Sequence, residues 1–266
     1  MAGGMVNKPI IAVAALVVVL AAAGAYFLRH RSASLPAEPA TAVHTSTAAE
    51  PGIEHPVPAG AQPGSPAALP ELQDSDAPLR DVLSQLAGAD AVKNYLLPEN
   101  VIRRLVVTID NLPRQKVAVE KRPTPPAPGS FLAVGDELHA TLDPNNFERY
   151  TPLVAVIGKL DMQQLAAVYF RFYPLFQQSY QNLGYPTGYF NDRLVQVIDV
   201  LLATPRPSGT VALVRPNVMY TYADPALEAR PAGQKLLLRM GPENAALIKT
   251  KLTELRAIIT ATPPKH

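Results

Sequence analysis

Two pairs of acidic residues have the side chains that hydrolysis of a sugar chain requires. They are Asp136 with Glu137, and Asp224 with Glu228. Two carboxyl groups that flank a glycosidic bond can act as acid and as base or nucleophile. Spacing along the chain does not give their separation in space, and surface carboxylates are usually solvated or cap helices. We therefore expect structural roles for these residues and keep a carboxylate-dependent cell-wall hydrolase as an alternative.

The chain has few residues for catalysis or metal binding by histidine or cysteine. His139 is the one histidine in the part of the sequence predicted to fold, and cysteine is absent. A Ser-His-Asp triad or a histidine-rich metal site would depend on His139 alone. Ser-x-x-Lys, Gly-x-Ser-x-Gly, His-Glu-x-x-His and phosphate-loop motifs are also absent from the sequence. We expect a non-enzymatic protein with no catalytic residue, no cofactor and no metal.

Arg171 is the only charged residue between Met162 and Leu183, where apolar side chains recur on nearly every face of a predicted helix. A charge inside a buried helix requires a partner. Two interpretations stay open. Arg171 forms a structural ion pair with Asp199 or Asp192, or it lines a cleft that binds a carboxylate.

Tyr185 and Tyr189 lie in a predicted turn, held by Pro186 and Gly188, between two helices. Tyrosine is favoured at interfaces because its ring is apolar and its hydroxyl still forms hydrogen bonds. The rings either fold back onto the preceding helix or form a contact surface. Together with Arg171 they are the candidate partner-binding residues. Rings that stack on sugars would make the domain a cell-wall glycan-binding module, which is a second alternative.

Residues 9–28 contain no charge and lie between Lys8 and Arg29. At about 1.5 Å per residue, a helix of this length crosses a hydrocarbon core of about 30 Å. The sequence predicts a short flank at 1–8 and one transmembrane helix at 9–28. A cleaved signal peptide is the alternative, but the apolar run continues through Leu28, beyond the small residues that cleavage would need.

Residues 29–69 have the composition of a disordered linker rich in proline and alanine. The stretch 32–70 holds eight prolines and no aromatic residue, so it cannot bury enough apolar surface to order itself. Flanking charges do not fix the orientation of the preceding span. A span followed by such a spacer is typical of bacterial envelope proteins, which favours an inner-membrane, single-pass protein with its C-terminal domain in the periplasm.

Residues 70–262 are predicted to form a single, mainly α-helical domain with one small β-hairpin. The net charge of +2 gives no indication of nucleic-acid binding. Apolar spacing, caps, glycines and prolines place the elements. The expected helices cover about 76–87, 90–96, 98–110, 143–158, 161–184, 191–204, 233–240 and 242–260, with one helical turn near 225 and the hairpin at 210–214 and 218–222.

Several short motifs resemble one bacterial family. They are Leu69-Pro70-Glu71-Leu72, Asp74-x-Asp76, Arg103-Arg104 followed by Thr108-Ile109-Asp110-Asn111-Leu112-Pro113, and the stretch from Gly233 to Asn244 that ends in Gly241-Pro242-Glu243-Asn244. Over roughly Leu69 to Thr262 the chain is similar to the family called domain of unknown function 3014. The resemblance implies an N-terminal span and a proline-rich tether in a Gram-negative envelope protein. It carries no established activity, so it transfers no residue role.

These observations predict a membrane-tethered scaffold or adaptor that binds another envelope protein. The expected partners are the membrane, through the single span, and an envelope protein. Peptidoglycan is the partner that the glycan-binding and hydrolase alternatives imply.

Overall fold

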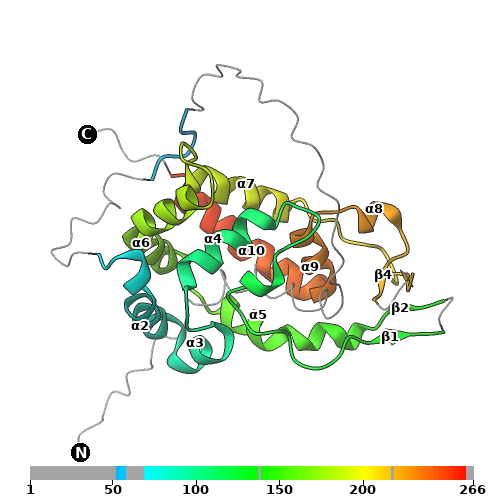
Figure 1. The fold of residues 1–266 in the computed structure, drawn as a ribbon. Coiled ribbons are helices and arrows are strands. Elements are labelled where there is room, and N and C mark those ends of the chain that lie inside the picture. Colours follow the sequence, from blue (N-terminus) through cyan, green and yellow to red (C-terminus); the bar gives the residue numbers. More distant parts are fainter. Residues whose placement is uncertain (1–51, 58–68, 137–138, 217–218, 262–266) are drawn as a thin grey trace, which may run out of the picture.

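The computed structural model describes residues 52–57, 69–136, 139–216 and 219–261. The predicted transmembrane helix at 9–28 and most of the predicted linker at 29–69 lie outside these ranges. The described part is mainly helical and carries two short antiparallel strand pairs (Figure 1).

The helices begin and end close to the residues that the caps, glycines and prolines indicated. The α-helices are α2 (Asp76–Ala87), α3 (Ala89–Tyr95), α4 (Val101–Asn111), α5 (Thr151–Gly158), α6 (Met162–Asn182), α7 (Phe190–Leu202), α8 (Pro225–Glu228), α9 (Ala232–Met240) and α10 (Pro242–Ile259). In the described residues, short 3-10 helices accompany them at η3 (Leu72–Asp74), η4 (Val119–Lys121) and η5 (Pro144–Arg149).

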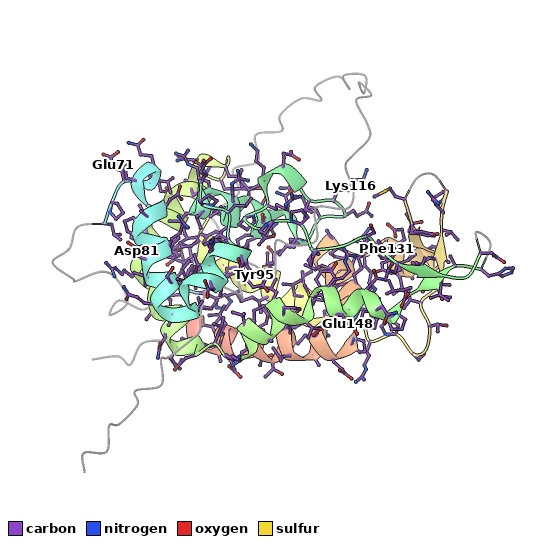
Figure 2. All side chains as sticks on the ribbon, turned by 90° about the horizontal axis from the view of Figure 1, so that it is seen from below. Glu71, Asp81, Tyr95, Lys116, Phe131 and Glu148 are labelled. Carbon is purple, nitrogen blue, oxygen red and sulfur yellow. The ribbon has the colours of Figure 1, made fainter. Side chains whose placement is uncertain are left out.

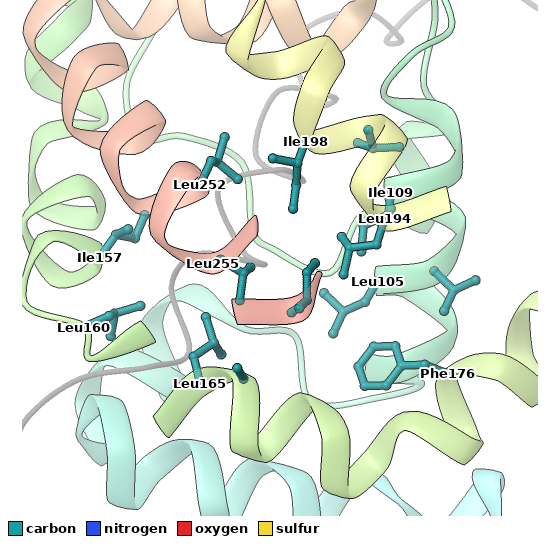
Figure 3. Packing of buried hydrophobic residues seen from close by; sticks show 14 of the residues in the cluster. Leu105, Ile109, Ile157, Leu160, Leu165, Phe176, Leu194, Ile198, Leu252 and Leu255 are labelled. Carbon is teal, nitrogen blue, oxygen red and sulfur yellow. The ribbon is translucent and has the colours of Figure 1, made fainter. Parts of the chain in front are cut away.

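Helix α10 lies at the centre of the helical body, where it contacts α5, α6, α7 and α9. Ile248, Leu252 and Ile259 of α10 are fully buried. Figure 3 shows how leucine and isoleucine side chains of α10 meet those of α4, α5, α6 and α7. Helix α6, which the sequence predicted to be apolar on nearly every face, lies beside α10 and exposes polar residues along one face.

The two strand pairs lie at the opposite end of the molecule from α2 and α3 (Figure 1). Strand β1 (Ala133–Val134) pairs with β2 (Thr141–Leu142), and β3 (Leu213–Val214) pairs with β4 (Thr221–Tyr222). A bridge between Thr141 and Ala212 joins the two pairs. In Figure 2, Glu71 and Asp81 mark the α2 end and Phe131 marks the strand end. The predicted hairpin is therefore present as β3 and β4, and a second pair accompanies it.

One predicted helix is divided in the structure. The sequence indicated a single helix from Asp143 to Gly158, but η5 ends at Arg149 and α5 begins at Thr151. Asp143 caps η5 by accepting the Asn145 N–H at 2.8 Å. Pro152 explains the break, because in a continuous helix its ring would clash with the carbonyl group four residues earlier.

Asp76, at the start of α2, binds the beginning of α4. Its two carboxylate oxygens accept the backbone N–H groups of Asn100 at 2.7 Å and Val101 at 2.8 Å. The carboxylate therefore satisfies amides at the start of α4, across the layer, where helix N-termini leave N–H groups unpaired. This is one contact through which the Asp74-x-Asp76 motif ties α2 to α4.

No single helix in 52–57, 69–136, 139–216 or 219–261 is long and apolar enough to cross a membrane. The pair α5 and α6 reaches that length and composition together, with a bend of 90° between the two helices.

Candidate functional site

The turn between α6 and α7 folds its two tyrosines back onto α6. The Tyr185 ring stacks on Tyr180 with centroids 4.6 Å apart and an interplanar angle of 22°. The Tyr189 ring lies 5.6 Å from that of Tyr173. Both residues are half-buried. Of the two interpretations left open by the sequence, the structure shows the one in which the rings pack on the preceding helix.

Gln177 of α6 fixes the position at which α7 begins. Its side-chain oxygen accepts the Phe190 N–H at 2.8 Å, and its side-chain amide donates to the Gly188 carbonyl at 2.7 Å. Tyr173 donates to the same Gln177 oxygen at 3.1 Å. Because one side chain satisfies both a donor and an acceptor of the turn, the first turn of α7 is held at a defined place on α6.

A segment from the predicted linker lies against this first turn. Residues 52–57, blue in Figure 1, contact Tyr189, Asn191 and Asp192 although they are more than 130 positions away in the sequence. The prediction of disorder throughout 29–69 is therefore wrong for these residues. Composition indicated disorder because it reports what a segment can bury by itself, and here the burial partner is a distant helix.

The contacts to the segment are made almost entirely to its main chain. Asp192 accepts the N–H of Glu54 at 3.1 Å and that of His55 at 2.6 Å, one on each carboxylate oxygen. Asn191 donates to the His55 carbonyl at 2.8 Å, and the Tyr189 hydroxyl accepts the Val57 N–H at 2.8 Å. We call residues Tyr189, Asn191 and Asp192 the segment-binding site.

One side chain of the segment is buried. Val57 is 7% exposed and belongs to the main hydrophobic cluster, whereas Ile53 is 56% exposed. The domain therefore binds the segment through its backbone and through one aliphatic side chain. Pro56, which has no N–H group, occupies the one position among the last four at which no N–H is bound.

Tyr169 of α6 orients the side-chain amide of Asn191. Its hydroxyl donates to the Asn191 side-chain oxygen at 3.0 Å, which leaves the amide nitrogen to donate to the carbonyls of His55 and Ile259. Burial raises the pKa of Tyr169 well above its ordinary value, and the nearby Tyr189 and Asp192 raise it further. The hydroxyl thus keeps the proton that this arrangement needs.

The next residue of α7, Arg193, contacts a buried carboxylate of α4. Asp110 of α4, whose side chain is 3% exposed, accepts from Arg193 at 2.9 Å and from Arg114 at 2.8 Å. The Tyr185 hydroxyl donates to it at 3.2 Å and accepts from Arg114 at 3.0 Å. This Asp110 cluster joins α4 to α7 and to the Tyr185 turn. Its interior carboxylate is compensated by two guanidinium groups, as a buried charge requires.

Tyr180 stacks on Tyr185 and lies near the charged groups of this cluster. Burial raises the pKa of Tyr180, and the neighbouring charges act in opposite directions: Arg193 and Arg114 lower it, while Asp110 and Tyr185 raise it. The ring therefore supports Tyr185 as a neutral aromatic surface.

Arg171 is not buried, which corrects the sequence prediction. The residue is exposed on α6, and its guanidinium carbon lies 5.5 Å from the centroid of the adjacent Phe172 ring. Asp199 pairs instead with Arg256 at 2.6 Å, and Asp192 binds the segment. Arg171 therefore pairs with neither predicted partner, because both carboxylates are engaged elsewhere. The structure does not bring Arg171 together with Tyr185 and Tyr189.

The first acidic pair and the histidine lie near the exposed tip of the β1–β2 pair. Asp136 and His139 are both exposed and contact each other at 3.1 Å, and Glu137 lies outside the described residues. No group of three or more histidine, aspartate or glutamate side chains within the described ranges is arranged to hold a metal ion.

The second acidic pair is engaged in structural contacts. Asp224 caps α8 by accepting the Ala226 N–H at 2.8 Å. Glu228 pairs with the nearly buried Lys235 at 2.8 Å and also accepts the Tyr222 N–H at 3.0 Å. Burial raises the pKa of the Tyr222 phenol to about 12, partly opposed by Arg239.

A separate apolar pocket of about 270 Å³ lies beside the junction of α9 and α10. Its wall includes Phe147, Pro207, Val211, Leu238, Pro242 and Lys249. Lys249 donates to the Thr204 carbonyl, and burial lowers its pKa. The pocket is lined mainly by aliphatic and proline side chains and brings no pair of acid–base groups together.

The Gly241-Pro242-Glu243-Asn244 motif shapes this junction. Asn244 donates to the carbonyls of Met240 at 2.9 Å and Phe147 at 3.1 Å. Gly241 has a φ of +84° and faces the Phe147 ring. The motif thus performs a packing role, in which the turn between two helices is fixed against η5.

Residues 101–256 match the sequence model of a family described as Protein of unknown function (DUF3014). This chain belongs to the DUF3014 family. No curated protein and no solved structure matches the chain. The family expected from the motifs is therefore confirmed, over a shorter range than the resemblance covered.

The DUF3014 range contains the segment-binding site, the Asp110 cluster and the Gly241 turn, but not the bound segment at 52–57. Sequence reasoning named Tyr189 as a candidate partner-binding residue and gave Asn191 and Asp192 other roles. It placed Asn191 at the start of a helix and gave Asp192 as one of two candidate partners of Arg171. An acidic residue in the first turn of a helix is ordinarily explained by the helix dipole, so no local signal revealed the contact.

Proposed function

We propose that this DUF3014 protein is a membrane-tethered, non-enzymatic adaptor whose periplasmic helical domain binds another envelope protein. In this proposal, the N-terminal apolar stretch at 9–28 anchors the protein in the inner membrane. Residues 29–69 are the spacer between the membrane and the helical domain. The observation that carries the proposal is the segment-binding site, where Tyr189, Asn191 and Asp192 hold a short piece of chain by its backbone.

A protein-binding role agrees better with these contacts than sugar binding does. The Tyr185 ring is stacked on Tyr180, and its hydroxyl lies in the Asp110 cluster. The Tyr189 hydroxyl accepts a backbone N–H from Val57. Side chains that read a main chain serve to recognise a peptide segment, whereas sugar recognition needs an open aromatic face.

The proposed location is tested by adding protease to spheroplasts that contain the full chain. A periplasmic domain is digested under these conditions, and a protein of the cytoplasm in the same cells remains intact as the control. Protection of the domain until the membrane is lysed would reverse the proposed topology.

The proposed partner is tested by cross-linking intact membranes and purifying the chain under denaturing conditions. We expect an envelope protein to be recovered with the wild-type chain and with Arg171→Ala, and to be reduced at least about five-fold with Asp192→Ala. Arg171→Ala is the matched control because it alters an exposed residue of α6 away from the segment. Equal recovery of the partner with both variants would mean that the partner does not bind at the segment-binding site. Binding of the purified chain to sacculi would favour the glycan-binding alternative.

A further inference from the structure

The contact between the segment and the domain is small and depends little on sequence. It consists of four hydrogen bonds to the main chain and one buried side chain, Val57. The side chain of Glu54 points to solvent, since the residue is exposed. Another chain with the same backbone groups and one aliphatic residue in the place of Val57 would satisfy every contact.

The covalent connection favours the protein's own segment. Eleven residues, 58–68, separate Val57 from the domain at Leu69. An intramolecular ligand on so short a connection acts at an effective concentration on the order of millimolar. A contact of this size is therefore occupied in the isolated chain even when its intrinsic affinity is weak, and a competing ligand meets a site that is already filled.

The segment-binding site lies inside the range matched by the family model, whereas the bound segment lies outside it. Tyr189, Asn191 and Asp192 lie within the matched range 101–256, and residues 52–57 lie outside it. Asn191 and Asp192 are held independently of the segment. Tyr169 orients Asn191, and Gln177 fixes the turn that precedes them. The binding groups are thus arranged by α6 and α7 and do not need the segment for their placement.

We propose that residues 53–57 are an exchangeable occupant of the segment-binding site, and that a partner displaces them with a short segment of the same kind. That segment has two successive residues with free N–H groups, a third position that accepts proline, and then an aliphatic residue. This inference rests on the proposed adaptor function and names the class of segment that the partner supplies. Binding of the partner then releases the protein's own linker from the domain.

The test uses a fluorescent peptide with the sequence of residues 50–60 and the purified full-length chain in detergent micelles. The peptide should bind the wild-type chain weakly, because its own segment competes. A chain with Val57→Asp, which expels the segment, should bind the peptide at least about ten-fold more tightly, in proportion to the fraction of empty site. Adding Asp192→Ala to that chain should abolish binding.

Val57 contacts the main hydrophobic cluster, so a second release variant is needed in case Val57→Asp harms the fold. Glu54→Pro removes the N–H that Asp192 binds and leaves every buried side chain in place. Circular dichroism and thermal melting verify that each variant remains folded. Equal binding of the peptide by wild-type and folded release variants would overturn the proposal, as would binding that persists with Asp192→Ala.

Matched peptides test which groups are recognised. In the labelled peptide, Glu54→Ala keeps the N–H and should bind as well as the parent, whereas Glu54→Pro and Val57→Asp should each lose at least about ten-fold in affinity. Loss of affinity with Glu54→Ala would contradict backbone recognition. Failure to cross-link an envelope protein while the peptide still exchanges would remove the adaptor function and keep the exchangeable site. The reverse result would remove the exchange alone.

Discussion

Gly241 faces the ring of Phe147 so closely that a Cβ atom on the glycine would lie within 2.5 Å of the ring Cδ2 atom. The backbone of Gly241 also has φ +84° and ψ 163°, a combination that is essentially restricted to glycine. Two independent constraints therefore select glycine at the junction of α9 and α10: the backbone conformation of the turn and the packing of Phe147 of η5 against it.

Gly241→Ala should lower the free energy of unfolding by about 3 kcal/mol or more, because it adds a steric clash to an unfavourable backbone conformation. Gly209→Ala is the matched control. Gly209 has a φ of +83°, and a Cβ atom added there would meet no other atom within 4 Å, so the substitution should cost only about 1–2 kcal/mol. Urea unfolding of both variants measures the difference. Equal losses would mean that the Phe147 ring moves aside at little cost.

Asp110→Asn should lower the free energy of unfolding by about 3 kcal/mol, because it leaves the largely buried Arg193 without its carboxylate partner. Arg114→Gln should cost less than about 1 kcal/mol, since the Arg114 side chain is 54% exposed. The two variants remove opposite partners of one ion pair. A larger loss for Arg114→Gln in urea unfolding would contradict the assignment of Arg193 as the main partner.

Tyr222 should make the protein less stable in alkali. Its folded-state pKa is raised to about 12, whereas in the unfolded chain a tyrosine releases its proton near pH 10. The stabilising contribution is therefore complete below about pH 10 and is lost as the pH rises toward 12, by about 2–3 kcal/mol. Unfolding measured at a series of pH values should show a smaller decline for Tyr222→Phe. An unchanged pH dependence would show that another buried tyrosine, such as Tyr169, dominates.

Arg171→Ala should change the free energy of unfolding by less than about 0.5 kcal/mol, because the side chain is exposed and forms no ion pair with Asp199 or Asp192. Arg256→Ala tests the ion pair that does form with Asp199. Thermal melting of the two variants measures both effects. A buried, ion-paired Arg171 would make Arg171→Ala strongly destabilising, whereas an exposed Arg171 would leave the melting temperature almost unchanged. A loss of several kcal/mol with Arg171→Ala would restore the buried interpretation.

Helix ends were the part of the fold that local sequence determined well. Asp161 caps α6 through the N–H groups of Gln163 and Gln164, and Asp224 caps α8, both as their positions before the helices indicated. Gly88 ends α2 with a φ of +87°. These features depend on a few neighbouring residues, so their physical causes are visible in a short window of sequence.

Which faces of α6 are buried was harder to predict from the sequence. Aromatic residues on several faces of α6 suggested burial all round, yet Arg171 and Pro174 are exposed. The aromatic side chains of α6 instead gather against α7 and the turn before it, where Tyr169, Phe176 and Phe190 pack together. Composition does not distinguish a helix surrounded by others from one whose aromatic face is unusually wide.

The segment-binding site lay beyond sequence reasoning because its parts are distant in the chain. Tyr189 was identified from its turn, but the N–H groups that define the site belong to Glu54, His55 and Val57. Backbone groups have no sequence signature, and a single Val57 in a proline-rich stretch gives no periodic pattern. Only the folded arrangement shows that an ordinary acidic residue of a helix, Asp192, binds two successive amides.

The single amide of Asn191 touches both ends of the described chain, since it donates to the carbonyls of His55 and Ile259. A pull applied to the chain on the N-terminal side of residue 52 would reach the domain first through residues 52–57, and therefore through the start of α7 and the last turn of α10. The elements that come next along the backbone, η3 and then α2, receive none of this pull until those four hydrogen bonds break. These four hydrogen bonds are therefore the first contacts of the described structure that such a pull would break.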